Sequence, residues 1–142
     1  MKDEKNDFLE TIQSDIANCD KNNQSNDPGM WKEFNTDDIA YWIEIGPDIC
    51  QHHEGPFENS LRMFNNGNQK RFCSQKIFSG TKVNGETYKR EWLLYSQSTG
   101  SVYCFVCKLF ASKTASSRFI EGFSDWRNII VVDQHENTRV VQ

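Results

Sequence analysis

The sequence predicts a small α+β domain in which a β-hairpin carries a pair of cysteines and a helix packs against it. Two runs rich in apolar and aromatic residues, Tyr88–Tyr95 and Ser101–Val106, flank the polar segment SQSTG. A polar turn that ends in glycine between two such runs is typical of a β-hairpin with a longer turn. Cys104 and Cys107 lie at the end of the second run, and thiolates at this spacing can both reach one zinc ion at about 2.3 Å. The hairpin therefore presents half of a tetrahedral zinc site.

The second half of the site is expected from a helix that follows the hairpin. Ser124, with Asp125 beside it, can cap such a helix, and His135 would then lie near the helix end. The run Ile129–Val132 is β-branched, which lowers helix propensity because χ1 freedom is lost against the preceding turn. A strand over residues 128–132 is therefore the alternative.

Cys104 and Cys107 have three other conceivable uses, namely a redox pair, a nucleophile assisted by His135, or two structural thiols. A redox pair needs its first cysteine at the start of a helix, and the segment KLFASKTASS after Cys107 starts no long helix. A nucleophile would need an oxyanion-hole motif and a third orienting group, and the sequence contains no such pattern. We therefore expect a binding module rather than an enzyme, without a small-molecule substrate, and structural thiols remain the alternative to zinc.

The start of the chain is expected to be a disordered acidic leader over residues 1–30. Its last part, DKNNQSNDPGM, is polar and rich in residues that break regular structure, so the domain is expected to span residues 31–142. The leader is too acidic for a secretory signal, and no apolar stretch approaches the length of a membrane span. Five cysteines at uneven spacing favour reduced thiols in an intracellular protein over a disulfide framework.

A short helix is expected at the start of the domain. Asn35 or Thr36 can cap it, acidic residues in its first turn suit the positive end of the helix dipole, and a Gly-Pro pair would end it. Cys50, His52 and His53 follow in a polar loop. Adjacent histidines in such a loop are usually solvated, so these three residues are only secondary metal candidates.

The charge of the chain is unevenly distributed. Residues 1–58 contain 14 acidic and 4 basic residues, whereas residues 59–127 contain 11 basic and 4 acidic ones. Such asymmetry indicates a nucleic-acid surface on the basic part, and the alternative is a solvated leader before an ordinary domain. Basic residues interleaved with aromatic ones suit phosphate contact, so we expect non-specific DNA binding by Arg62, Lys70, Arg71, Lys76, Lys89 and Arg90.

The segments NGETYKREWLLYS, YCFVCKLF, GFSDWRN and HEN occur in this order between Asn84 and Asn137, within a resemblance to a known family that extends from about Asp38 to Asn137. In these segments the chain resembles the TTF-type zinc finger, which precedes the transposase region of hAT-family elements and of host proteins derived from them, including some MYM-type zinc finger proteins. The resemblance implies a nuclear, zinc-dependent DNA-binding module without the downstream catalytic domain. It also implies that residues 31–142 form a finger that is incomplete at its C-terminus, in a chain truncated before the transposase region.

The resemblance further implies the zinc ligands Cys104, Cys107 and His135, and it places the fourth ligand on Val141, which cannot bind a metal. The fourth position would then be filled by water, by an out-of-pattern group such as Cys73 or Glu136, or by nothing. We accordingly expect weak zinc binding and a frayed chain beyond His135. The alternative function is a protein-interaction or vestigial module whose finger has lost its metal affinity.

Overall fold

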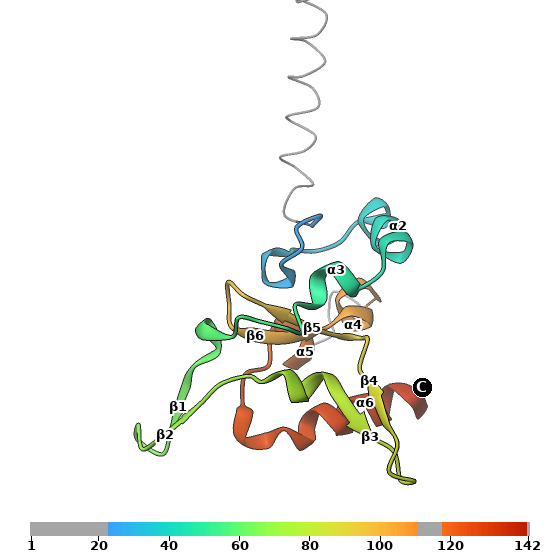
Figure 1. Cartoon of the computed structure of the whole chain (residues 1–142). Helices are drawn as coiled ribbons and strands as arrows, with labels where there is room; N and C mark the ends of the chain where they lie inside the picture. The colour runs from blue at the N-terminus through green and yellow to red at the C-terminus, as the bar shows by residue number, and fades with distance from the viewer. Residues whose placement is uncertain (1–22, 111–117, 142) are drawn as a thin grey trace, which may run out of the picture.

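The computed structural model describes residues 23–110 and 118–141, with side chains as far as Asn137 at the C-terminal end. These residues form three two-stranded antiparallel hairpins and a series of helices, and most of the helices surround the third hairpin (Figure 1). This arrangement confirms the predicted α+β fold class. Most of the expected acidic leader, residues 1–22, lies outside the described residues.

The central hairpin consists of β5 (Leu93–Ser96) and β6 (Ser101–Cys104), which pair from Leu93 opposite Cys104 to Ser96 opposite Ser101. Every residue of both strands is buried, because other elements cover both faces of the hairpin. Successive side chains of a strand point to opposite faces. One face therefore contributes to one hydrophobic cluster and the other face, with Leu94 and Tyr103, to a second cluster.

The two clusters gather aromatic residues from the whole chain around this hairpin. The first lies toward the C-terminal elements and includes Phe78, Trp92, Phe119, Phe123, Trp126 and Val132. The second lies toward the N-terminal elements and includes Trp31, Trp42, Cys50 and Leu109. The hairpin that carries Cys104 is thus packed on both faces, which gives the cysteine pair a rigid support.

The expected first strand, Tyr88–Tyr95, is divided in the structure. Strand β4 (Thr87–Lys89) ends before Arg90, and β5 begins only at Leu93. The backbone N–H of Arg90 donates to the carbonyl of Phe78, and the N–H of Leu93 donates to the carbonyl of Arg90. These bonds turn the chain, so the two halves of the apolar run belong to different hairpins.

The second strand is shorter than expected. Strand β6 ends at Cys104, and helix α4 (Phe105–Phe110) begins at once instead of a strand that continues to Val106. The N–H of Phe105 donates to the carbonyl of Trp92, which closes the ladder at this point. Consequently Cys104 is the last residue of a strand, and Cys107 lies in the helix that follows.

The expected N-terminal helix is confirmed as α2 (Thr36–Ile45). Asn35 and Asp38 form a reciprocal capping box, and the chain leaves the helix at Gly46 with φ of 82°. Each bond of such a box satisfies a backbone N–H that has no partner inside the helix. The short helix α3 (Asp48–Gln51) follows and packs on β5.

Residues 23–30 belong to the folded body, which differs from the expected disorder of the leader. The indole N–H of Trp42 donates to the carbonyl of Asn23. Asp27 caps the 3₁₀ helix η1 (Pro28–Met30), and its carboxylate accepts bonds from Ser96 and Ser98 at the turn of the central hairpin. Composition alone predicts a linker here, but polar side chains of this segment form hydrogen bonds with residues far away in the sequence.

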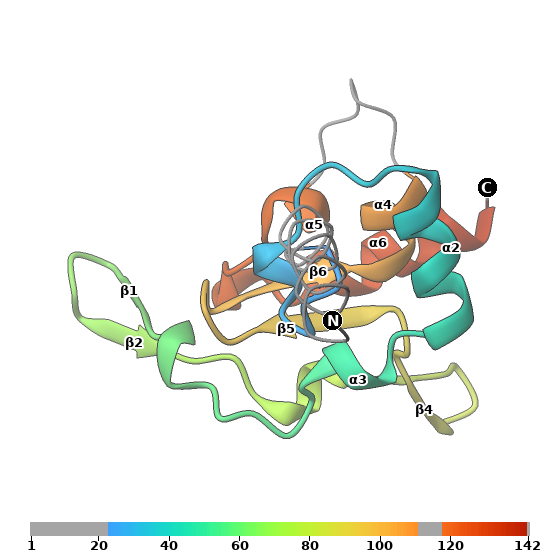
Figure 2. The ribbon, with the colours of Figure 1, turned by 90° about the horizontal axis from the view of Figure 1, so that it is seen from above.

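The remaining hairpins are less buried. Hairpin β1 (Arg62–Phe64) with β2 (Gln69–Arg71) follows the 3₁₀ helix η2 (Glu58–Ser60) and projects from the body (Figures 1 and 2). Hairpin β3 (Ser79–Thr81) with β4 follows the 3₁₀ helix η3 (Gln75–Phe78).

The C-terminal part contains α5 (Arg118–Glu121), the 3₁₀ helix η4 (Trp126–Asn128) and α6 (Ile130–Val141). The helix is therefore confirmed, and the alternative strand over residues 128–132 is wrong. The cost of a few β-branched residues in a helix is a few tenths of a kcal/mol each, whereas burial of a side chain such as Val132 contributes about 1.5 kcal/mol or more. Asp125, rather than Ser124, acts as a cap, and it caps η4.

No helix among the described residues is long and apolar enough to cross a membrane.

The turn of the central hairpin depends on Gly100. Its φ is 67°, and a Cβ there would lie 1.9 Å from the carbonyl oxygen of Asn59.

We predict that Gly100→Ala lowers the free energy of unfolding by about 3 kcal/mol, since the backbone must move to relieve the clash. Gly85→Ala is the matched control, because Gly85 has φ of 91° with nothing within 4 Å. Gly85→Ala should lower the free energy of unfolding only by the strain of a left-handed alanine, about 1–2 kcal/mol. Urea unfolding measures both losses, and equal losses would contradict the prediction.

Candidate metal centre

The two cysteines meet at the junction of β6 and α4. Cys104 is fully buried at the end of the strand, and Cys107 is half-buried in the first turn of the helix. The backbone N–H of Cys107 donates to the Sγ of Cys104 at 3.4 Å. The abrupt change from strand to helix therefore brings both sulfurs to one side of the hairpin end.

His135 reaches the cysteines from α6. Its Nε2 lies 3.5 Å from the Sγ of Cys107, and the three ligand atoms of Cys104, Cys107 and His135 all lie within 4.8 Å of one another. The imidazole packs on the rings of Phe119 and Trp92, with centroid distances of 4.4 and 5.4 Å. The structure thus brings together the three residues that the sequence predicts as metal ligands.

The geometry fits a zinc ion. Zinc binds sulfur at about 2.3 Å and imidazole nitrogen at about 2.0–2.1 Å, and a tetrahedral angle then separates the two atoms by about 3.6 Å. The distance of 3.5 Å between Cys107 and His135 agrees with this value. Two thiols and one imidazole also form a donor set that suits zinc better than magnesium or calcium, which prefer oxygen.

The other described cysteines and histidines lie in different surroundings. Burial raises the pKa of the Cys50 thiol and of the Cys73 thiol to about 12, which disfavours their thiolate forms where no metal is bound. His52 Nε2 lies 2.7 Å from the carbonyl oxygen of Asn26, and His53 lies near Glu54. Among the described residues, the groups that could hold a metal do not include Cys50, His52 or His53.

Neither out-of-pattern candidate for the fourth ligand joins the described cluster. Cys73 lies in the first hydrophobic cluster, where its Sγ is 3.8 Å from the carbonyl oxygen of Ser74. The carboxylate of Glu136 accepts bonds from the indole N–H of Trp92 at 2.6 Å and from the hydroxyl of Tyr88. Burial raises the pKa of Glu136, but these bonds and the charge of Arg90 outweigh it and hold the pKa below its ordinary value.

The course of α6 changes the expectation for position 141. The helix runs unbroken from Ile130 to Val141, so the chain does not fray directly after His135. Val141 lies six residues beyond His135, which places it about 9 Å farther along the helix axis and on a different side. A ligand at that position would share an ion with His135 only if the helix ended earlier. Arg139, one turn beyond His135, lies on the same helix face.

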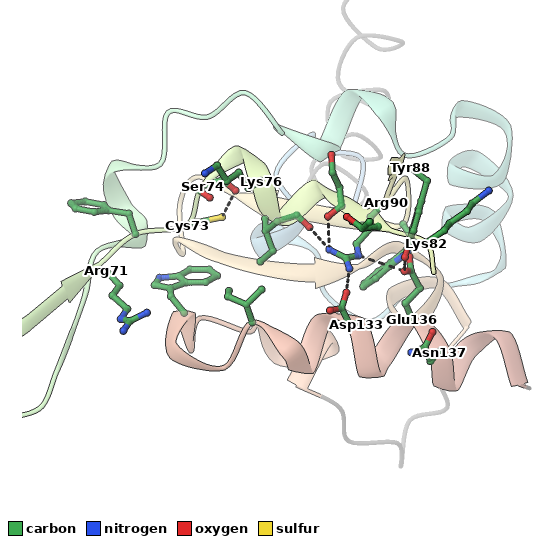
Figure 3. A pocket seen from close by; sticks show the side chains of 18 of the residues that line it. Arg71, Cys73, Ser74, Lys76, Lys82, Tyr88, Arg90, Asp133, Glu136 and Asn137 are labelled. Atoms are coloured by element: carbon green, nitrogen blue, oxygen red, sulfur yellow. Dashed lines mark hydrogen bonds and ion pairs between the residues drawn. The ribbon is translucent and has the colours of Figure 1, made fainter. Parts of the chain in front are cut away.

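Ion pairs of the buried Arg90 hold α6 beside the metal centre. Arg90 is only 4% exposed, and its guanidinium donates to the carbonyls of Ile77 and Ser79 and pairs with Asp133 and Glu136 of α6. Figure 3 shows Arg90 between these two carboxylates. Arg90 is expected from the sequence to contact phosphate, but in the structure its partners are the carboxylates of α6. The pair Asp133 and Glu136, three residues apart on the predicted helix, is the signal that could have indicated them.

The six basic residues expected to bind DNA fall into two groups. Lys70, Arg71, Lys76 and Lys89 are exposed. Arg62 is half-buried and donates five hydrogen bonds, four of them to backbone carbonyls, and Arg90 is buried in its ionic network. The structure therefore leaves four of the six side chains accessible to a phosphate.

A groove of about 1310 Å³ lies between the η3–β3 segment and α6 (Figure 3). Its lining includes Arg71, Lys76 and Lys82 from the hairpin side and Asp133 and Glu136 from α6. The groove is open, and the Arg90 network is part of its lining. The accessible positive charge therefore lies on the hairpin side of the groove.

Most of the chain has relatives among known proteins. Zinc finger MYM-type protein 5 of Homo sapiens is 30% identical over 118 residues, and the Macaca fascicularis and Mus musculus proteins of the same name are 29% identical over 118 and 26% identical over 116 residues. These relatives are zinc finger proteins. The matches cover 80–82% of this chain but 16–17% of the relatives, so the chain spans about a sixth of their length. No family model and no solved structure matches the chain.

The similarity relates the chain to MYM-type zinc finger proteins and agrees with the Cys/His cluster of the structure. It shows neither the TTF-type finger nor the hAT transposase of the sequence resemblance. The aligned stretch and the cluster together support a zinc-binding module.

We predict that the purified chain binds one zinc ion and that Cys104→Ser weakens this binding. Replacing a residue that only hydrogen-bonds to a metal ligand typically weakens metal binding by about 10- to 100-fold, and loss of a direct ligand should weaken it by more. Cys73→Ser is the control, since it removes a buried thiol away from the cluster. Zinc content after dialysis and competition with a chelating dye measure the effect. Equal zinc affinity of the two variants would contradict the assignment.

We also predict that Arg139→His tightens zinc binding by about tenfold or more, because it adds a fourth ligand one turn beyond His135. Val141→His should leave the affinity unchanged as long as α6 remains unbroken to that residue. Competition titrations compare the two variants. If only Val141→His tightens binding, the helix ends before residue 141 in the zinc-bound protein.

Proposed function

We propose that this chain is a zinc-dependent DNA-binding module in which Cys104, Cys107 and His135 hold the ion. The observation that carries the proposal is the convergence of three donors from β6, α4 and α6, with sulfur and nitrogen at the separation that tetrahedral zinc requires. The names and similarity of the relatives support it.

In this module zinc acts as a structural cross-link. When bound, it supplies bonds between the β6–α4 junction and α6, two parts that are 28 residues apart in the chain. The binding energy of such an ion is part of the folding energy of a small domain. The ring contacts of His135 with Phe119 and Trp92 orient the imidazole toward the sulfurs, so the chain itself presents the donors.

DNA is the proposed partner because of the charge on the basic half. Residues 59–127 contain 11 basic and 4 acidic residues, and Lys70, Arg71, Lys76 and Lys89 are exposed. Neutralisation of phosphates by such side chains releases counterions and provides sequence-independent affinity. A nuclear location follows from this partner as part of the proposal. Derivation from an hAT-type transposase with a TTF-type finger rests on the sequence resemblance and stays a prediction.

A second candidate function is protein interaction through α2 and α3. Ile43, Ile45 and Ile49 are 60%, 44% and 46% exposed on this part of the molecule. They lie among the acidic residues Glu44 and Asp48. An exposed apolar surface with acidic neighbours favours a protein partner over a nucleic acid.

We predict that the zinc-loaded chain binds duplex DNA and that the logarithm of its affinity falls steeply with the logarithm of salt concentration. Lys76→Ala combined with Lys89→Ala should reduce this slope by about 1.8, at about 0.9 for each phosphate contact. Lys32→Ala, an exposed lysine on the acidic half, is the control and should leave the slope unchanged. Fluorescence anisotropy at several salt concentrations provides the measurement. Absence of DNA affinity at low salt, or equal affinity after zinc removal, would refute the proposed function.

A further inference from the structure

The hairpin formed by β1 and β2, residues 62–71, is here called the β1–β2 ribbon. It projects from the body in two perpendicular views (Figures 1 and 2). Its strands pair from Arg62 opposite Arg71 to Phe64 opposite Gln69. Strand β1, from Arg62 to Phe64, rises about 3.3 Å per residue and so extends about 7 Å, and the turn of residues 65–68 lies beyond it.

The base of the ribbon is fixed to the body. The guanidinium of Arg62 donates to the carbonyls of Asn59 and Thr99 at 2.9 Å and also contacts Ser124 Oγ at 3.3 Å. The ring of Phe64 lies 4.3 Å from the guanidinium carbon of Arg127. These contacts hold the ribbon in one direction, which lowers the entropic cost of binding through it.

The tip of the ribbon consists of exposed amides. Asn65 and Asn66 have φ of 54° and 57°, Gly67 has φ of 88°, Asn68 completes the turn, and Gln69 is the first residue of β2. In the described part of the chain, no hydrogen bond engages the side-chain amides of Asn65, Asn66 and Asn68, while Gln69 accepts a single bond of 3.5 Å from Arg71. Asn and Gln amides can bond the N6 and N7 edge of adenine in the major groove.

The charge of the ribbon has no acidic counterpart in its sequence. Residues 59–85 contain no Asp or Glu. Arg62 and Arg71 lie directly opposite each other, an arrangement that is destabilising for like charges. An anion beside Arg71 would relieve this repulsion. Phosphate groups on either side of an inserted ribbon supply such anions.

We propose that the β1–β2 ribbon enters the major groove of duplex DNA, with the amides of Asn68 and Gln69 on base edges and Lys70 and Arg71 on the flanking phosphates. The major groove of B-form DNA, about 12 Å wide and 8.5 Å deep, admits a two-stranded ribbon. This inference rests on the proposed DNA-binding function and adds to it a sequence preference. The deep, narrow major groove of an A-form RNA duplex excludes the same ribbon.

The test starts with the zinc-loaded chain and a pool of short duplexes whose central base pairs are randomised. Selection should yield a preferred sequence, which then serves as the probe beside a scrambled duplex and an RNA duplex. Asn68→Ala with Gln69→Ala should reduce the preference for the selected over the scrambled duplex by about tenfold to hundredfold and leave the salt slope unchanged. Lys70→Ala with Arg71→Ala should instead lower the slope by about 1.8 on both duplexes.

Gln24→Ala with Lys32→Ala is the matched control, because it removes an exposed amide and an exposed charge on the acidic half. It should behave as the unchanged chain, and circular dichroism and zinc content verify that each variant is folded. Selection of no preferred sequence, equal affinity for the RNA duplex, or ribbon variants that retain both preference and slope would each overturn the inference. In those cases the chain still binds DNA, so the proposed function stands. Only a chain without DNA affinity removes both.

Discussion

The fold depends on the buried position of Arg90. Its backbone N–H donates to Phe78, its carbonyl accepts from Gln51 of α3, and its guanidinium is fixed by two carbonyls of the η3–β3 segment and two carboxylates of α6. A buried cation without partners is strongly unfavourable, so Arg90 needs these carbonyls and carboxylates even though the Asp133 side chain is itself 54% exposed. This requirement joins α3, η3, β3 and α6 around the point where the chain turns into the central hairpin.

The same network determines where His135 lies. Glu136, the next residue of α6, binds the indole N–H of Trp92, and the ring of Trp92 packs on His135. Helix α6 is therefore held beside the hairpin end by contacts that do not involve a metal. A bound ion would add bonds to an arrangement already near the required geometry, so less of its binding energy would be spent on ordering the ligands.

The sequence was sufficient for the parts of the fold that depend on local patterns. The hairpin, the Cys-x-x-Cys at its end and the Asn35 cap follow from turn chemistry, spacing and helix capping. The sequence was insufficient where the position of a side chain depends on a partner far away in the chain. A basic residue in a basic segment looks accessible, and only the fold shows that Arg90 meets Asp133, 43 residues later. The division of the Tyr88–Tyr95 run has the same cause, because the inward turn at Arg90 overrides strand propensity.

The metal centre and the β1–β2 ribbon are connected through the central hairpin. One end of β6 carries Cys104, and the turn at its other end offers the carbonyls of Thr99 and Gly100 to Arg62 at the base of the ribbon. Three strand residues, 101–103, therefore separate the anchor at Gly100 from Cys104, which carries the thiol. A two-stranded hairpin alone is marginally stable in water, and β5–β6 gains its rigidity from the elements packed on both faces. An ion that fastened α6 to the cysteine end of β6 would thus stabilise the strand whose turn carbonyls hold Arg62 at the base of the ribbon.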